Sequence, residues 1–521
     1  MNQQPAPECN QNPDGRSITL SRLLQGIIEV PATMDRQISS LTLDSRAVLP
    51  GSLFCATKGT ITHGLDFVAQ AQARGAVAII CEPNPAWSTD QHAQLAANID
   101  IPLLTITDLN LKISTIAGRF YGDPGFNLDL IGITGTNGKT SVSQIIAQAL
   151  TPDQCCGVVG TLGYGINNKF ASTGHTTPDA VQLQSILAKL LSAGAKTVAM
   201  EISSHALAQN RAAGLPINTA IFTNLTRDHL DYHHNLGAYA QAKGRLFKMP
   251  GLRHAILNAD DPISYEILAT LHPKVEPIFY SLTPGYVPKR PKIRWLRLEF
   301  MEHQPRGMRL WIIGSWGNGG ITVPMMGYFN AANILAALAA LILRAPNQNL
   351  GTALHQLGRV KGVPGRMECF GNHTQPLVVV DYAHTPDALE QVLKELKMQQ
   401  PQRLICVFGC GGDRDKGKRP QMGNVAERLS DMVILTDDNP RHEDGDHIIQ
   451  DILSGTVHPD AIHIQRQREA AIQHALTIAT PKDIVLIAGK GHETTQNING
   501  VEHQFSDRLT VVKLLNSRFR P

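Results

Sequence analysis

The sequence predicts an α/β protein of three domains, built around a mainly parallel central sheet. The first observation is length, because 521 residues exceed the roughly 250–300 that one hydrophobic core can organise. The second is pattern: apolar strand-like runs alternate with helical stretches, as in parallel sheets covered by helices. The third is the clustering of turn-forming residues at 121–125 and 362–366, which divides the pattern into three parts.

The first predicted domain spans 17–125 and follows a polar segment, 1–16, that we expect to be a flexible arm. Apolar runs at 77–81 and 103–106 are rich in β-forming residues, whereas the alanine-rich stretch 65–75 has a helical pattern. This alternation predicts a small α/β domain.

The second predicted domain, 126–362, continues the alternation. We expect strands at 128–134, 197–202 and 219–223, and a helix at 140–150. Between Lys292 and Val323 the hydrophobic period shortens toward two, which predicts an antiparallel insertion.

The third predicted domain, 363–521, repeats the order of strand and helix. Its expected strands lie at 377–381, 404–408, 432–435 and 484–488. This pattern predicts a Rossmann-like, doubly wound domain.

Composition excludes several classes of protein. With 42% hydrophobic and 17% charged residues, the chain is neither disordered nor fibrous. Its 47 basic and 44 acidic residues leave a net charge of +3, far from the concentrated positive charge of a nucleic-acid-binding protein. The eight cysteines are scattered without a CxxC pair, so we expect reduced thiols.

The sequence favours a cytoplasmic protein without a membrane partner. Its first twenty residues lack the continuous apolar stretch of a secretory signal. The nearly apolar run 331–343 has thirteen residues, fewer than the roughly 20 of a membrane-spanning helix, so we expect a buried helix there. We also expect a monomer.

A glycine loop between a strand and a helix predicts a nucleotide-phosphate site of the P-loop type. The loop and helix start contain Gly135, Thr136, Asn137, Gly138, Lys139, Thr140 and Ser141. Glycines let main-chain N–H groups face phosphates, Lys139 neutralises charge, and Thr140 can ligate Mg²⁺. The upstream glycines, Gly132 and Gly135, depart from the usual GxxxxGK[ST] spacing. A tight turn with an incidental lysine is the alternative.

Two further polar residues, Glu201 and His229, follow predicted strands, at the edge where open α/β sheets bind ligands. They could meet a Mg²⁺ ion beside the phosphates, although Glu201 could also be a surface carboxylate. His229 and His233 are four residues apart, but without a third ligand nearby a zinc site is disfavoured. For His205, His233 and His234 we favour hydrogen-bonded loop positions.

These segments resemble, in this order, the landmarks of the Mur ligases, the ATP-dependent amide-forming enzymes of peptidoglycan precursor synthesis. The likeness spans nearly the whole chain and includes 135–141, 201–205, 223–229, 327–333, 365–368 and 381–384. Other segments look like those of the family branch that adds the third peptide residue: 43–46, 175–177, 411–414, 438–441 and 489–493. The resemblance implies that successive domains bind UDP, ATP and the amino acid.

For the ATP end, the resemblance implies that loop 135–141 and Arg366 hold the phosphates, Asn333 meets the adenine and Asp381 the ribose. Asn333 could instead bond a neighbouring main chain, and Arg366 and Asp381 could form a salt bridge.

For catalysis and metal binding, the resemblance implies roles for Lys139, Thr140, Glu201, His229 and Lys243. Lys243 would be carbamylated, meaning that its neutral amine has captured CO₂ and become a carboxylate that ligates a second Mg²⁺. Such chemistry requires a lowered lysine pKa. Without the resemblance, an exposed helix lysine is the simpler interpretation.

The resemblance also implies two sets of contacts for a UDP-muramoyl-dipeptide. The uridine end would contact Leu43, Ser45, Thr60, Ile61 and Thr62, the last three being equally compatible with ordinary loop positions. The dipeptide end would contact His175, Thr176, Thr177, Ser203, Gln209 and Arg211. Arg211 suits a substrate carboxylate, whereas Ser203 and Gln209 could simply cap or turn the chain.

The amino-acid pocket implied by the resemblance consists of Arg414, Asp438, Asn439, Pro440, Arg441, Gly489 and Glu493. Two arginines suit carboxylates, while Glu493 suits a distal ammonium. Arg441 accompanies meso-diaminopimelate in the family, so we expect that substrate rather than L-lysine. For the segment 438–440 alone, a bare turn is the alternative.

The implied reaction begins when the D-glutamate carboxylate attacks the γ-phosphate of ATP and forms an acyl phosphate. The amino acid's amine then displaces phosphate and an amide remains. Three alternatives stay open at this point: a lysine-adding ligase of the same family, a ligase resembling folylpolyglutamate synthetase, and a nucleotide-gated binding protein that ligates nothing.

Overall fold

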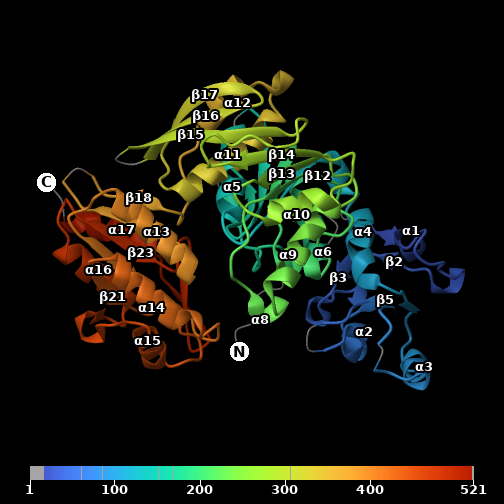
Figure 1. Cartoon of the computed structure of the whole chain (residues 1–521). Coiled ribbons are helices and arrows are strands. Elements are labelled where there is room, and N and C mark those ends of the chain that lie inside the picture. Colours follow the sequence, from blue (N-terminus) through green and yellow to red (C-terminus); the bar gives the residue numbers. More distant parts are fainter. Residues whose placement is uncertain are drawn as a thin grey trace.

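The structure is a computed structural model that describes residues 17–518 except 60, 61, 85, 152, 168, 305, 306 and 373. Three sheets with parallel strands follow one another along the chain. In Figure 1 the blue N-terminal part and the orange to red C-terminal part lie on opposite sides of the central part. The predicted α/β class is confirmed, while the arm expected at 1–16 lies outside the described residues.

The N-terminal part is a small parallel sheet with helices. Its strands, in sheet order, are β3 (Ser40–Thr42), β4 (Ser52–Ala56), β5 (Ala76–Cys81) and β6 (Leu103–Thr105). A short antiparallel pair, β1 (Ile18–Thr19) and β2 (Gln37–Ile38), accompanies the sheet. The helices are α1 (Leu20–Leu23), α2 (Val68–Ala73), α3 (Thr89–Ala97) and α4 (Leu109–Phe120). The helix expected at 65–75 begins with a 3₁₀ turn, Gly64–Phe67, because His63 and Asp66 form a capping box there.

The central part contains eleven strands in the order β10-β9-β8-β11-β7-β12-β13-β14-β15-β16-β17. The run from β8 to β15 is parallel and comprises β8 (Cys156–Gly160), β11 (Thr197–Glu201), β7 (Asp129–Thr134), β12 (Ile217–Phe222), β13 (His254–Asn258), β14 (Glu276–Ser281) and β15 (Arg294–Gln304). The flanking strands β9 (Gly163–Ile166), β10 (Lys169–Ala171), β16 (Gly307–Gly314) and β17 (Gly317–Val323) are antiparallel. The predicted antiparallel insertion is therefore confirmed as β15 to β17.

Helices cover both faces of this sheet. They are α5 (Lys139–Leu150), α6 (Ala180–Ser192), α7 (Ser204–Ala208), α8 (Leu230–His233), α9 (Leu236–Gly244), α10 (Ile263–Thr270), α11 (Tyr328–Ile342) and α12 (Leu350–Leu357). Ile131 and Ile133 of β7 pack in one core with α5 and α11, whereas Leu130 packs with α6 in another. Because β7 is buried on both faces, its interior residues, 130–133, are all apolar or glycine.

Helix α11 is the buried helix that the apolar run 331–343 predicted. Across the described residues, none of the helices combines the length and apolarity that crossing a membrane requires.

The C-terminal sheet has the order β18-β19-β23-β20-β21-β22. The strands are β18 (Glu368–Phe370), β19 (Leu377–Asp381), β23 (Ile484–Ala488), β20 (Leu404–Phe408), β21 (Met432–Leu435) and β22 (His463–Ile464), with only β18 antiparallel to its neighbour in this described sheet. Its helices are α13 (Pro386–Met398), α14 (Lys418–Leu429), α15 (Gly445–Leu453), α16 (Arg468–Ile478) and α17 (Asp507–Arg518). A hairpin of β24 (Thr495–Ile498) and β25 (Val501–Gln504) follows β23. The four predicted strands are all present.

The start of the C-terminal part packs closely against segment 489–493 at Gly365. Its φ is +64°, and a Cβ there would lie 2.2 Å from the main-chain nitrogen of His492. Glycine is therefore required both by the backbone conformation and by the neighbouring main chain.

Candidate active site

The phosphate loop joins β7 to α5 and depends on two glycines. Gly135 and Gly138 have φ values of +149° and +87°. A Cβ at Gly135 would lie 1.8 Å from the Thr223 hydroxyl, and one at Gly138 would lie 2.3 Å from Oδ1 of Asn333. The loop thus folds tightly against the end of β12 and against α11, as the sequence predicted for a strand–loop–helix site.

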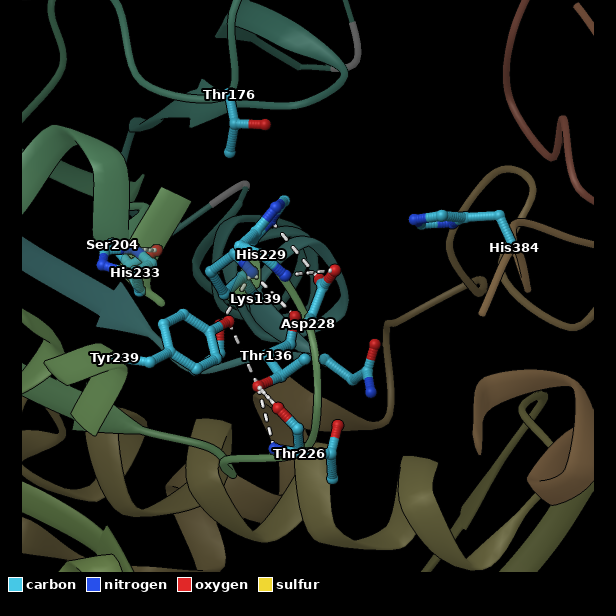
Figure 2. Close-up of polar contacts among 12 residues, drawn as sticks. Thr136, Lys139, Thr176, Ser204, Thr226, Asp228, His229, His233, Tyr239 and His384 are labelled. Carbon is cyan, nitrogen blue, oxygen red and sulfur yellow. Dashed lines mark hydrogen bonds and ion pairs between the residues drawn. The ribbon is translucent and has the colours of Figure 1, made fainter. Parts of the chain in front are cut away.

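Residues after β12 hold this loop in place. The Thr223 hydroxyl donates to the Asn137 carbonyl at 2.6 Å, and Oδ1 of Asn224 accepts from the Asn137 N–H at 3.0 Å. The Thr136 hydroxyl lies 3.3 Å from that of Tyr239, on α9 (Figure 2). The predicted site omitted Thr223 and Asn224, although a polar run at the end of a neighbouring parallel strand was a signal for them. It also omitted Tyr239, which lies on α9.

Lys139 lies over the loop that precedes it. Its Nζ donates to the carbonyls of Gly135 at 2.8 Å and Thr136 at 2.9 Å. Burial lowers the pKa of Lys139, which Glu201 and Asp228 partly counteract. Figure 2 shows Lys139 beside His229 and Asp228, with Thr176 and His384 around the same space.

Glu201, at the end of β11, is buried and directly contacts the start of α5. Its carboxylate accepts hydrogen bonds from the Thr140 hydroxyl at 3.0 Å, the Thr161 hydroxyl at 3.0 Å and the Thr161 N–H at 2.9 Å. The alternative of a surface carboxylate is wrong, since the residue is 1% exposed. Thr161 was missed, because it meets Glu201 only through the neighbouring positions of β8 and β11 in the sheet.

The histidines differ in their surroundings. His233 is buried and hydrogen-bonded as expected, since its Nε2 lies 2.9 Å from the Ser204 hydroxyl. The expected loop position is wrong for His233, which ends α8, and for His205, which lies on α7. The side chain of His229 is 48% exposed and forms an ion pair of 3.4 Å with Asp228. Within the described part of the chain, no cluster of three or more His, Cys, Asp or Glu side chains is arranged to hold a metal. The convergence of Glu201 and His229 on one ion stays a prediction.

Lys243 is 1% exposed on α9, so the interpretation as an exposed helix lysine is wrong. Its Nζ donates to the Gly135 carbonyl at 2.7 Å and lies 4.2 Å from the centroid of the Tyr239 ring. Burial, together with the charge of Lys139, holds its pKa well below the ordinary lysine value. This environment favours a neutral amine.

The residues predicted for adenosine come from α11 and the C-terminal part. Asn333 is buried, and its Nδ2 donates to Oδ1 of Asn330 at 3.1 Å. Asp381 accepts the Met367 N–H at 2.7 Å, and burial raises its pKa to about 6 although Arg366 opposes the shift.

Arg366 connects the C-terminal part to the phosphate loop. Its Nη2 donates to the Thr140 hydroxyl at 3.3 Å, and its Cζ lies 4.5 Å from the centroid of the Tyr382 ring. Arg366 therefore contacts the loop itself, rather than the partner, Asp381, of the alternative salt bridge.

The residues predicted for the dipeptide lie on the other side of Glu201. Arg211 donates from Nη1 to the Thr177 carbonyl at 2.7 Å and from Nε to Gln209 at 2.9 Å. The Thr177 hydroxyl donates to the main-chain carbonyl of Glu201 at 2.8 Å. Ser203 caps α7, which is the local role that we weighed for it.

Two other members of this set are placed differently. The Thr176 hydroxyl is 3.1 Å from that of Thr161, so Thr176 joins the group around Glu201. His175 is exposed, and its main-chain carbonyl accepts from the Thr173 hydroxyl.

The predicted uridine contacts lie in the N-terminal part. The Ser45 hydroxyl is buried and donates to Gln70 at 2.7 Å, while Leu43 is half-buried against the N-terminal core. Thr62 is exposed. Thr60 and Ile61 lie outside the described residues.

The predicted amino-acid residues converge at the ends of β20, β21 and β23. A Cβ at Gly411 would lie 2.9 Å from Nη1 of Arg441 and 3.7 Å from Cγ of Arg414, so both arginines flank this glycine. Arg441 has φ +53° and donates to the Gly412 carbonyl at 2.7 Å.

The acidic side of this pocket is also assembled. Asn439 donates from Nδ2 to Glu493 at 2.9 Å. A Cβ at Gly489 would lie 2.5 Å from the Asp438 carboxylate, and one at Gly412 would lie 1.9 Å from the Pro440 carbonyl. The prediction omitted Lys490 from this pocket; the structure shows that Lys490 donates to Glu493 at 2.7 Å.

These contacts place a buried carboxylate, Glu201, against the phosphate loop, with Arg211 on one set of elements and Arg414 and Arg441 on another. Such an arrangement can bind a nucleoside triphosphate between two carboxylate-bearing substrates.

Comparison with known proteins identifies the family. Three models match in succession: the Mur ligase family catalytic domain over 37–121, the Mur ligase middle domain over 133–341, and the Mur ligase glutamate ligase domain over 365–491. A UDP-N-acetylmuramoyl-L-alanyl-D-glutamate--2,6-diaminopimelate ligase from Pseudomonas aeruginosa is 47% identical over 91% of this chain and 94% of that protein. The enzyme of the same name from Alkalilimnicola ehrlichii is 44% identical, covering 95% and 98%.

Solved structures agree with these relatives. A structure bearing the same enzyme name has a TM-score of 0.68 and 34% identity, over 97% of this chain and 100% of that one. MurF from Thermotoga maritima, in complex with ADP, and the folylpolyglutamate synthase of Mycobacterium tuberculosis have TM-scores of 0.59 and 0.58 at 17% and 18% identity, a likeness of fold alone. The chain therefore belongs to the Mur ligases, the ATP-dependent amide-forming ligases, and within them to the UDP-N-acetylmuramoyl-L-alanyl-D-glutamate--2,6-diaminopimelate ligases.

Proposed function

We propose that this chain joins meso-2,6-diaminopimelate to the D-glutamate of UDP-N-acetylmuramoyl-L-alanyl-D-glutamate, with ATP as the energy source, in peptidoglycan precursor synthesis. The names of its relatives support both organic substrates. The observation that carries the proposal is the position of Glu201. Its carboxylate contacts Thr140 of the phosphate loop, and its main chain contacts Thr177, the partner of Arg211.

In the first step, the D-glutamate carboxylate attacks the γ-phosphate of ATP and ADP leaves, giving an acyl phosphate. Arg211 would orient the dipeptide through a carboxylate. Lys139 would turn from the carbonyls of Gly135 and Thr136 to the phosphates and stabilise the charge that develops there. Arg366 contacts Thr140 and would add a second cation.

In the second step, the amine of diaminopimelate attacks the acyl phosphate, and phosphate leaves through a tetrahedral intermediate. Arg414 and Arg441 would bind the distal carboxylate and Glu493 the distal ammonium, which supports diaminopimelate over lysine. Movement of the C-terminal part about 362–365 would exclude water that otherwise hydrolyses the acyl phosphate.

The oxygen atoms beside the loop suit Mg²⁺, because the buried Thr140 hydroxyl and a Glu201 carboxylate oxygen lie 3.0 Å apart. We propose that Thr140, Glu201, His229 and carbamylated Lys243 hold Mg²⁺, which neutralises phosphate charge when bound. The lowered pKa of Lys243 supports carbamylation, because only a neutral amine captures CO₂.

We further propose domains at 17–125, 126–362 and 363–521. Small molecules would be the partners of a cytoplasmic monomer that binds neither nucleic acid nor membrane. These assignments stay predictions.

The deciding experiment measures phosphate release with ATP and the UDP-muramoyl-dipeptide over a panel of amino acids. We expect release with meso-diaminopimelate and a tripeptide product in the mass spectrum. Release that requires lysine would favour the lysine-adding ligase, and stimulation by a folate would favour the folylpolyglutamate route. ATP hydrolysis without any amide product would indicate a nucleotide-gated binding protein.

A further inference from the structure

Lys490 occupies the centre of the predicted amino-acid pocket without being exposed to solvent. It follows β23 and Gly489, whose φ of +112° turns the chain inward. The Lys490 side chain is 0% exposed, and its Nζ donates to Oδ1 of Asn439 at 3.0 Å and to Oε2 of Glu493 at 2.7 Å. A buried ammonium thus lies in direct contact with the carboxylate proposed to bind a substrate ammonium.

Asn439 closes a triangle with these two charged groups. Its Nδ2 donates to the same Glu493 oxygen at 2.9 Å, while its Oδ1 also accepts the Asn497 N–H at 2.9 Å. Lys490 therefore links the loop that contains Asn439 to the segment that contains Glu493 by hydrogen bonds. Asn439 extends this link to the β24–β25 hairpin.

The neighbouring buried cation has a separate partner. Arg468 is paired with Asp507 at 2.7 Å and donates to the Ala488 carbonyl at 2.9 Å. The charge of Asp507 is thus already matched, and the carboxylate that Lys490 contacts is that of Glu493.

We propose that Lys490 is a positioning residue that sets the selectivity for the amino-acid substrate; this inference rests on the proposed function. Lys490 fixes Glu493 and Asn439 and neutralises the Glu493 carboxylate before any substrate arrives. A substrate must then supply a distal carboxylate for Arg414 and Arg441 in addition to its distal ammonium.

The physical reason is that a carboxylate already paired with a buried cation attracts a second cation less strongly. At its distal end L-lysine carries an ammonium but no carboxylate, and that ammonium would bind weakly to Glu493. Diaminopimelate also offers a carboxylate, which the two arginines can bind. Without Lys490, the unpaired Glu493 would attract any ammonium, and lysine would gain relative to diaminopimelate.

The test uses full-length Lys490→Gln, which keeps a hydrogen-bond donor but removes the charge, and Lys490→Arg, which keeps the charge. Lys482→Met, at an exposed position just before β23, is the matched control. The measurement is kcat/KM for meso-diaminopimelate and for L-lysine, together with KM for ATP and for the UDP-muramoyl-dipeptide.

We expect Lys490→Gln to lower the diaminopimelate-to-lysine ratio of kcat/KM by about tenfold or more, with KM for ATP within about twofold of wild type. Lys490→Arg should retain more of the ratio, and Lys482→Met should retain all of it. An equal loss with both amino acids, an equal effect of the Gln and Arg variants, or an unchanged ratio would overturn the inference. A wild-type protein that does not turn over diaminopimelate would instead refute the proposed function.

Discussion

Two lysines, one in the central part and one in the C-terminal part, are equally buried but have different partners. Lys243 and Lys490 are 1% and 0% exposed. Lys243 contacts a carbonyl and an aromatic ring, with Lys139 nearby, whereas Lys490 contacts the Glu493 carboxylate. The comparison teaches that burial alone does not determine what a lysine does. Without a carboxylate a buried amine tends to lose its proton and become a nucleophile, while with one it serves as a fixed cation.

The largest expected effect is the loss of activity in Lys243→Met. If the carbamylated residue helps to bind Mg²⁺, tripeptide formation should fall by about 1,000-fold. The thermal midpoint should be at least that of wild type, because methionine removes an amine that is costly to bury. Lys248→Met, an exposed lysine of the same segment, is the control. Near-normal turnover would show that Lys243 has no role in catalysis.

Lys490→Met should clearly lower the free energy of unfolding, whereas Lys243→Met should not. The change removes the buried cation that pairs with the Glu493 carboxylate, together with one of the two donors to Oδ1 of Asn439, and we expect unfolding to require about 2 kcal/mol less. Urea denaturation followed by circular dichroism measures this difference. Equal stability of the Lys243 and Lys490 variants would remove the contrast between the two sites.

Asp381 is a buried carboxylate, in contrast to the two buried lysines, and its contribution to stability depends on pH. Its folded pKa of about 6 lies above the ordinary value of 3.8, so the native state binds the proton more tightly and wild-type stability falls as pH rises from 4 to 7. Asp381→Asn lacks this titration and can still accept the Met367 N–H. We therefore expect the variant to gain about 1–2 kcal/mol relative to wild type between pH 4 and pH 7. A constant difference across this range would contradict the raised pKa.

The smallest expected effect concerns CO₂. Removing dissolved CO₂ and bicarbonate at pH 7 should lower wild-type activity several-fold, because the Lys243 carbamate dissociates, and adding bicarbonate should restore it. Lowering the pH should strengthen the effect, since protonation of the amine competes with carbamylation. If activity does not depend on CO₂ at any pH, Lys243 is not carbamylated.

Local patterns were sufficient to predict the strands, the phosphate loop and the buried helix α11. The interior of the strand, 130–133, lacks polar side chains because both faces of β7 are buried, and Gly135 and Gly138 are required by their backbone conformations. Those signals are contained in a few adjacent residues. The roles of Asn333 and Lys243 needed the family resemblance. The structure adds that both are buried, that Asn333 donates to Asn330, and that burial holds the pKa of Lys243 low.

Other residues could not be predicted, because their positions depend on the order of strands in the sheet. Thr161 is forty residues from Glu201 in sequence but meets it because β8 and β11 are neighbours. Lys490 and Asn439 are 51 residues apart and meet because β23 and β21 both flank β20. No short-range pattern in the sequence reports such contacts.

The tight packing of Gly365 against His492 has a mechanical consequence. The glycine precedes Arg366, which contacts Thr140, and the main chain of His492 is next to Glu493. A shift of the segment around Glu493 would push on Gly365 and so displace the guanidinium that touches the phosphate loop. A methyl group at Gly365 would overlap the main chain of His492, so we expect Gly365→Ala to move Arg366 relative to Thr140.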